Sequence, residues 1–100
     1  MDASSAQLLD QGAALPDHVV FREFPTETVV LNLKNGTYHG LNPSAARMLE
    51  ALTSEPTIGA AASAIARVYG APLEEVEEDI QILCTQLAER DLIELRGEAG

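Results

Sequence analysis

The dipeptide Asn35-Gly36 constrains this chain more than any other feature of its sequence. Asn-Gly between apolar runs is the strongest short-range signal for a β-hairpin, because both central residues of a type I′ turn need positive φ. Residues 28–33 and 37–41 on either side are rich in β-forming side chains, and so is an earlier segment over 18–24. The sequence therefore predicts three antiparallel strands in a meander, with a two-residue loop joining the second strand to the third.

The expected loop also sets the register of the hairpin. With two loop residues, Leu33 pairs with Tyr38, and hydrogen-bonded pairs alternate with non-bonded pairs, beginning with a bonded pair at the turn. The residues whose backbone groups then point toward the second strand are Thr37, His39 and Leu41. The backbone groups of Tyr38 and Gly40 point away from it, toward whatever lies beyond the third strand.

Three helices are predicted after the strands, each from its capping residues and its apolar spacing. Asn42 followed by Pro43 is a typical helix start, Thr57 is a second N-cap, and Gly70 is a typical helix stop. The expected helices cover residues 43–52, 57–69 and 72–90, and the apolar residues after them could form a short strand. The predicted fold class is α+β: a three-stranded antiparallel meander followed by three helices, similar to a winged helix.

The length of 100 residues fits one domain, and 46% apolar residues are enough for a packed core. We expect a flexible N-terminal tail over 1–16, the domain over 17–95 and a C-terminal tail over 96–100. The first residues contain no lysine or arginine and do not resemble a signal peptide, and no apolar run approaches the ~20 residues of a membrane span. Since the one cysteine also fits a reducing compartment, we expect a cytoplasmic protein.

The charge of the chain argues against several classes of partner. It has 16 acidic residues against 6 lysines and arginines, a formal net charge of −10. Nucleic acids and anionic membranes would repel such a chain, so neither is expected as a partner. A winged-helix DNA-binding regulator is the weaker alternative, because the third helix carries acids over 74–79 and no basic residue before Arg90.

No arrangement of residues in the sequence predicts catalysis. The soft metal ligands His18, His39 and Cys84 lack any paired spacing. No serine stands in a nucleophile motif, and the glycines are too scattered for a phosphate-binding loop. We therefore expect no catalytic residue, no metal, no cofactor and no enzyme activity.

The third strand is expected at the edge of the sheet, without the usual protection of an edge. Residues 37–41 contain no proline, lysine or acidic residue, and Gly40 leaves the backbone unshielded. One interpretation is that the third helix or the N-terminal tail covers this edge. Another is that an extended peptide adds to it as a further strand. A structural or adaptor subunit that pairs through the same edge is a further alternative.

The segment NGTYHGLNPSAARML over 35–49 resembles the hairpin and first-helix motif of the PqqD-like family of peptide-recognition domains, also called RiPP recognition elements. Residues 87–93 resemble the closing motif of that family. Asp91 stands there in place of the usual glycine, and aspartate also tolerates the left-handed conformation. The resemblance extends over residues 17–95.

The resemblance implies a non-catalytic chaperone of peptide biosynthesis. Such domains bind the leader segment of a ribosomally synthesised precursor peptide as an added strand on the third strand, in a groove walled by the third helix. They present the precursor to a modifying enzyme. That enzyme is, for instance, a leader peptidase or cyclase of the lasso-peptide type, or a radical SAM enzyme in maturation of a cofactor such as pyrroloquinoline quinone.

The expected peptide-binding residues lie on the third strand and the third helix. The strand contributes Thr37, Tyr38, His39, Gly40 and Leu41. The helix contributes pockets for apolar leader side chains at Val76, Ile80 and Leu83, although a plain core role is equally compatible with these three. Asp79, with Glu75, is expected to meet a leader lysine or arginine, although acids at a helix N-terminus also simply complement the helix dipole.

Overall fold

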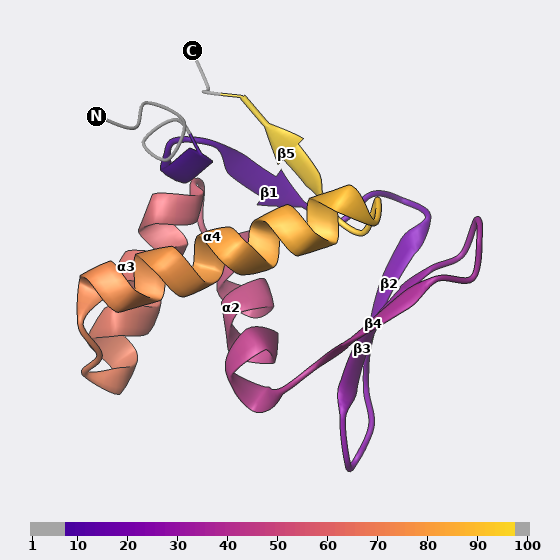
Figure 1. Ribbon diagram of the computed structural model, residues 1–100, viewed down its shortest axis with the longest axis horizontal. Helices are drawn as coiled ribbons and strands as arrows, with labels where there is room; N and C mark the ends of the chain where they lie inside the picture. Colours follow the sequence, from indigo (N-terminus) through magenta and orange to yellow (C-terminus); the bar gives the residue numbers. More distant parts are fainter. Residues whose placement is uncertain (1–7, 98–100) are drawn as a thin grey trace.

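The computed structural model describes residues 8–97. This part of the chain folds into two antiparallel sheets and three helices (Figure 1). The strands are β1 (Gly12–Ala14), β2 (Val19–Glu23), β3 (Thr28–Asn32), β4 (Tyr38–Leu41) and β5 (Glu94–Arg96). The helices are α2 (Pro43–Ser54), α3 (Ile58–Tyr69) and α4 (Leu73–Glu89). The predicted fold class is confirmed, because the β2-β3-β4 meander precedes the three helices along the chain.

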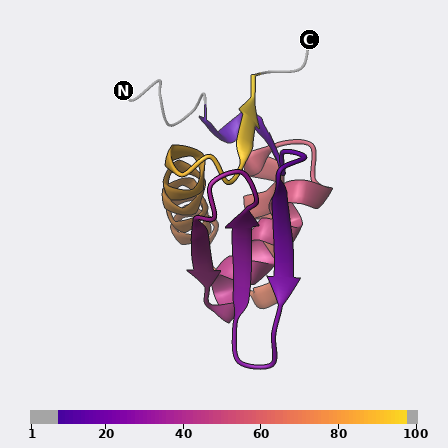
Figure 2. The ribbon, with the colours of Figure 1, turned by 90° about the vertical axis from the view of Figure 1, so that its right-hand side faces the viewer.

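The three-stranded sheet has β3 in the middle, between β2 and β4. One face of the sheet packs on the helices, and the other points away from them (Figure 2). The packed face carries Val30 and Leu41, which are both buried. Tyr38 lies on the other face, opposite Leu31, and is largely exposed. The sheet therefore shields the helices on one side and leaves its own outer face open.

The predicted two-residue loop between β3 and β4 is wrong. Leu31, not Leu33, pairs with Tyr38, which shifts the register by two positions and leaves a loop over 33–36. Of the two central residues, only Gly36 has a positive φ, at 76°. Since side chains alternate along a strand, a shift of two positions leaves every side chain on its predicted face.

Two asparagine side chains stabilise this longer loop. Oδ1 of Asn32 accepts a hydrogen bond from the Lys34 N–H at 2.9 Å, and Oδ1 of Asn35 accepts one from the Thr37 N–H at 2.9 Å. Such side-chain bonds to the backbone two residues on are typical of Asx turns. They satisfy the N–H groups of Lys34 and Thr37. With a two-residue loop, these two groups would instead have bonded to the backbone of the opposite strand.

The helices begin and end close to the predicted capping residues. The Asn42 side chain accepts a hydrogen bond from the Ala45 N–H at 2.8 Å, and Thr57 accepts one from the Ala60 N–H at 3.0 Å. Gly70 ends α3 with a left-handed φ of 64°. These contacts lie within four residues of each helix end, which is why the sequence alone predicts them.

The C-terminal end of α4 is closed by a Schellman motif. The Leu92 N–H donates to the Leu87 carbonyl at 2.8 Å and the Asp91 N–H donates to the Ala88 carbonyl at 3.1 Å. Asp91 itself is left-handed, with φ 57°, in the place where the resemblance leads one to expect glycine. The aspartate therefore serves the same backbone function here.

Asp91 also joins the end of α4 to the sheet. Its carbonyl accepts a hydrogen bond from the side-chain amide of Asn32 at 3.2 Å, and its carboxylate lies 3.0 Å from Nε2 of His18. Asn32 is completely buried. These two contacts fix where the C-terminal half of α4 lies relative to β2 and β3.

The structure corrects the expected N-terminal tail for the residues that it describes. Gly12–Ala14, within the expected tail over 1–16, form β1 and pair with β5. The Gln11 carbonyl accepts a hydrogen bond from the Ile58 N–H at 2.8 Å, which ties the segment to the start of α3. At the other end of the chain, β5 includes Arg96, which is the first residue of the expected C-terminal tail. Tail residues 1–7 and 98–100 lie outside the described range.

The core lies between the packed face of the sheet and the three helices. It is aliphatic, as expected of a chain with 4% aromatic residues. Its large, completely buried apolar side chains come from the sheet, from all three helices and from the segment after α4: Val30, Leu49, Leu52, Ile58, Ile80, Leu87 and Leu92. None of the helices described here is long and apolar enough to cross a membrane.

Candidate functional site

The outer edge of β4 is the first component of the candidate site. The Asn32 N–H donates to the Thr37 carbonyl at 2.8 Å, which makes these two residues a hydrogen-bonded pair. Bonded and non-bonded pairs alternate along an antiparallel ladder. His39 and Leu41 therefore also point their backbone groups at β3, whereas Tyr38 and Gly40 point theirs outward. The corrected register leads to the same outward residues as the predicted one.

This edge is accessible to another chain. Within residues 8–97, no strand pairs with the outer side of β4. Tyr38 is 64% exposed and Gly40 is also exposed. A Cβ at Gly40 would lie 3.6 Å from Oε1 of Glu27, an ordinary contact. The outward N–H and C=O groups of two residues are thus available as a template for a further strand.

Helix α4 lies beside this edge, on the same side as the packed face of the sheet (Figures 1 and 2). A cavity of about 190 Å³ separates α4 from the residues that follow β4. Its lining consists of Asn42, Ser44, Ala45, Met48, Asp79, Ile82, Leu83 and Gln86. We refer to this cavity together with the outer edge of β4 as the β4–α4 groove.

A second cavity, of about 480 Å³, continues the groove between α2, α3 and α4. The two cavities share Ser44, Met48 and Asp79 in their linings. The second one adds apolar side chains, among them Ile65 and Val76. The two cavities therefore form one continuous path from the end of β4, lined by both apolar and polar side chains.

The structure brings some of the expected site residues to the groove. Asp79 and Leu83 line it, and Val76 lines the adjoining cavity. Val76 and Leu83 are nevertheless only 5% and 6% exposed, so only a few atoms at the rim of each side chain are accessible to a ligand. Glu75 is exposed but lines neither cavity.

The prediction of a peptide pocket at Ile80 is corrected. Its side chain is completely buried in the core, on the part of α4 that faces the other helices. An exposed surface for a ligand cannot come from a residue with no accessible area. The apolar spacing in the sequence identified the core stripe of α4, and Ile80 lies at its centre.

Sequence reasoning missed the apolar residue of α4 that borders the groove from outside. Ile82 is 52% exposed and lines the groove together with Gln86. Both stand at helical spacing from Asp79, at i+3 and i+7. Ile82 lies outside the apolar stripe of α4 that forms the core, but it lies on the same face of the helix as Asp79 and Gln86. This position is the signal in the sequence that could have identified Ile82 as a groove residue.

His39 adds a titratable group near the start of β4. Burial lowers the pKa of His39 below its ordinary value, and the positive charge of Arg90 lowers it further. The imidazole is therefore neutral at neutral pH. The positive charge at this end of the groove is that of Arg90, at the C-terminal end of α4.

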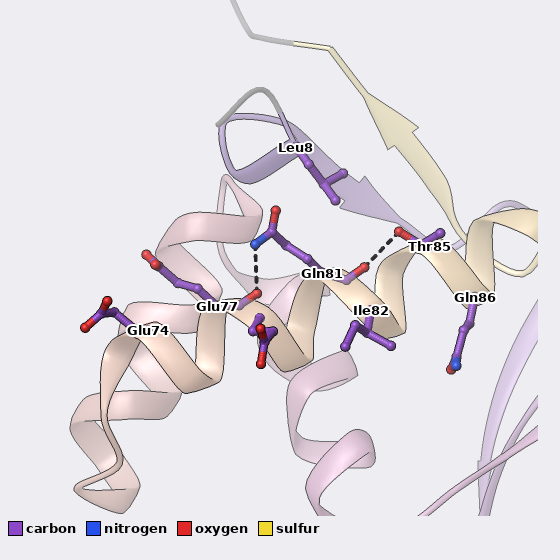
Figure 3. Close-up of a pocket in the computed structure, with 8 residues that line it drawn as sticks. Leu8, Glu74, Glu77, Gln81, Ile82, Thr85 and Gln86 are labelled. Atoms are coloured by element: carbon purple, nitrogen blue, oxygen red, sulfur yellow. Dashed lines mark hydrogen bonds between the residues drawn. The ribbon is translucent and has the colours of Figure 1, made fainter. Parts of the chain in front are cut away.

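A third cavity, larger than the other two, lies along α4 on its solvent side and is lined partly by Leu8 (Figure 3). Its volume is about 740 Å³, and it carries the carboxylates of Glu74, Glu77 and Glu78. Ile82 and Gln86 line both this cavity and the groove, so they form the ridge between the two. This cavity offers acidic side chains but no free strand, and it is therefore the weaker candidate for peptide pairing.

The described residues show no arrangement suited to metal or thiol chemistry. Within residues 8–97, no group of three histidine, cysteine or acidic side chains could hold a metal ion. Cys84 is completely buried, and burial raises the pKa of its thiol to about 12. A thiol with such a pKa remains protonated at neutral pH and does not act as a nucleophile.

Comparisons with known proteins give one family and two similar structures. Residues 27–93 match the family model described as coenzyme PQQ synthesis protein D (PqqD). TbiB1, solved in complex with the TbiA(beta) leader peptide, is 30% identical, and the match covers 87% of this chain and 99% of that chain, with a TM-score of 0.71. A search of curated proteins finds no match.

The second structure is a lasso peptide synthetase B1 complexed with the leader peptide. It is 23% identical, and the match covers 82% of this chain and 96% of that chain, with a TM-score of 0.73. At this identity the likeness shows that the fold is shared. Both structures therefore share the overall fold of this chain.

Proposed function

The chain belongs to the PqqD family, and from this premise we propose that it binds the leader segment of a ribosomally synthesised precursor peptide. The leader adds to the outer edge of β4 as an extended strand and lies in the β4–α4 groove. The observation that carries the proposal is the free edge: the outward backbone groups of Tyr38 and Gly40 have no partner strand within residues 8–97.

In this proposal the strand and the helix have different roles. Tyr38 and Gly40 supply backbone hydrogen bonds, which bind any extended segment, while Thr37, His39 and Leu41 hold β4 against β3. The rims of Val76 and Leu83 and the exposed Ile82 contact apolar leader side chains. Asp79 meets a basic leader residue. The relative TbiB1, solved with a leader peptide, supports this assignment of the ligand class.

We further propose that the chain itself carries out no chemistry and presents the bound precursor to a modifying enzyme. That enzyme is a leader peptidase of the lasso-peptide type or a radical SAM enzyme. The inert state of the Cys84 thiol supports a binding role rather than a nucleophilic one. Co-purification with each class of enzyme, in the presence and absence of the precursor, distinguishes between them.

The test of peptide binding is a fluorescence titration with the labelled leader of the precursor peptide encoded beside this chain. We expect saturable binding that Gly40→Pro abolishes, because proline removes one outward N–H and its ring blocks the approach of a strand. Gly40→Ala is the matched control. It keeps the N–H, and its Cβ makes only an ordinary contact, so binding should be retained within about twofold.

Normal binding by a folded Gly40→Pro protein would show that β4 is not the docking edge. Random duplex DNA serves as the ligand control, and saturable binding to it would instead favour a winged-helix regulator. Sedimentation over a range of concentrations tests the adaptor alternative, in which the edge pairs with a second copy of the chain.

A further inference from the structure

We propose that the β4–α4 groove selects its peptide by the order of two charges: a lysine or arginine beside Asp79 and an aspartate or glutamate beside Arg90. This inference rests on the proposed function, since it describes the peptide that β4 takes up. It extends that function from binding an extended segment to recognising a charge pattern along it.

Asp79 on α4 and Arg90, the residue that caps the C-terminal end of α4, lie along one stripe of the helix. Residues eleven positions apart differ by only about 20° around a helix of 3.6 residues per turn. Leu83 and Gln86 lie between them at i+4 and i+7, and both line the groove with Asp79. Along the wall of the groove, α4 and its C-cap residue therefore present an acid, an apolar residue, an amide and a base.

The two ends of this stripe lie at opposite ends of β4. Asp79 shares the cavity with Asn42 and Ser44, which follow the last residue of β4. Arg90 directly precedes Asp91, whose carbonyl accepts a hydrogen bond from the Asn32 side chain at 3.2 Å. The Asn32 N–H in turn donates to the carbonyl of Thr37, the residue directly before β4, at 2.8 Å. The stripe therefore places its acid beside the end of the strand and its base beside the start.

Neither of the two charges is neutralised by an ion pair in the described part of the chain. The ion pairs found there join other residues. Arg47, which lines the adjoining cavity, is 3.1 Å from Glu50, so its charge is compensated. A bound peptide therefore meets one acidic end and one basic end.

The spacing of the two charges on the peptide follows from the geometry of helix and strand. Eleven residues of helix rise about 16 Å, a length that an extended chain covers in about five residues. Side chains on one face of a strand recur every second residue. The two complementary charges on the peptide are therefore four or six positions apart. The long, flexible side chains that carry these charges make up the remaining difference in length.

The direction of the peptide fixes which charge comes first. Antiparallel pairing is the more stable and the commoner arrangement. An antiparallel peptide begins beside the end of β4, where Asp79 lies, and finishes beside the start, where Arg90 lies. The basic residue therefore precedes the acidic one.

A peptide-display selection tests this rule with two proteins of equal net charge. Random peptides of about twelve residues are selected on the natural chain and on the double variant Asp79→Arg/Arg90→Glu. We expect the natural chain to enrich peptides with a base four or six positions before an acid. We expect the double variant to enrich the reverse order.

Synthetic peptides then give the size of the effect. Reversing the two charges of an enriched peptide should weaken binding to the natural chain about tenfold at low salt and about twofold at high salt, because exposed charge pairs are screened. The neutral variant Asp79→Asn/Arg90→Gln should bind both orders equally, and it provides a test should the charge-reversed protein fold poorly.

Enrichment of the same charge order by both proteins, or of no order, would overturn the charge rule. The proposed function would then stand on its own if Gly40→Pro still abolishes binding of the enriched peptides. Failure of the natural chain to enrich any peptide would overturn the charge rule and the proposed function together.

Discussion

At the scale of single residues, Asn32 links the wall of the groove to the sheet. Its amide donates to the Asp91 carbonyl at 3.2 Å and its Oδ1 accepts the Lys34 N–H at 2.9 Å. The side chain is completely buried, so water does not reach its partners, and loss of these hydrogen bonds costs free energy of folding. Because Asp91 follows the end of α4, Asn32 helps to set the distance between α4 and β4.

Removing this side chain should destabilise the protein. We expect Asn32→Ala to lower the free energy of unfolding by about 1–3 kcal/mol, since it leaves buried polar groups without partners. Lys34→Ala is the control, because it keeps the backbone N–H and should change stability by less than about 0.5 kcal/mol. Urea unfolding followed by circular dichroism measures both, and equal effects would contradict the role given to Asn32.

The Cys84 thiol provides a second prediction at this scale. Since burial raises its pKa to about 12, only about one thiol in ten thousand is ionised at pH 8. We expect almost no reaction with a disulfide reagent in the native state and rapid reaction in concentrated urea. Stoichiometric reaction of the folded protein within seconds would show that the thiol is accessible.

The raised pKa of Cys84 also predicts that stability falls as the pH rises above the ordinary pKa of a thiol. The folded pKa of Cys84 is raised, so its contribution is fully present below the ordinary value of 9.0 and is lost as the pH rises toward about 12. Cys84→Ala should therefore reduce the loss of stability above pH 9.

At the scale of elements, β1 is held by a close approach that only glycine allows. A Cβ at Gly12 would lie 2.9 Å from the Pro56 carbonyl oxygen, which is backbone and cannot move easily. We expect Gly12→Ala to lower the free energy of unfolding by about 1–3 kcal/mol through overpacking. Gly97→Ala is the matched control, since nothing lies within 4 Å of its Cβ, and its urea midpoint should not change.

The sequence predictions were correct where a structure depends on neighbouring residues and wrong where it depends on residues distant in the sequence. The caps at Asn42, Thr57 and Gly70 were predicted correctly because each depends on neighbours within four residues. The hairpin loop was not, because Asn32 bonds to Asp91, 59 positions away, and also binds the loop backbone. No local turn preference contains that information.

At the scale of the whole molecule, the candidate site combines parts that are distant in the sequence. The edge position of β4 could be predicted from the three-stranded meander, whereas the facing surface of α4 could not. Apolar spacing selected Ile80, which is buried, and missed Ile82, which is 52% exposed. Only the packing of α4 against the other helices determines which of the two faces solvent.

Charge acts over the whole molecule and gives a prediction about salt. With a net charge of −10, self-repulsion should destabilise the fold at low ionic strength. We expect the urea midpoint to rise between about 20 mM and about 500 mM sodium chloride as screening increases. The variant Glu77→Lys/Glu78→Lys, with four fewer units of negative charge, should respond less. An equal response would show that screening is not the cause.

The most direct test of the central claim is amide hydrogen exchange along β4, with and without a bound leader peptide. We expect the Tyr38 and Gly40 amides to exchange rapidly in the free protein and to become protected when the peptide binds. The His39 and Leu41 amides, which already bond to β3, should be slow in both states. Saturable binding that leaves the Tyr38 and Gly40 amides unprotected would contradict strand addition at this edge.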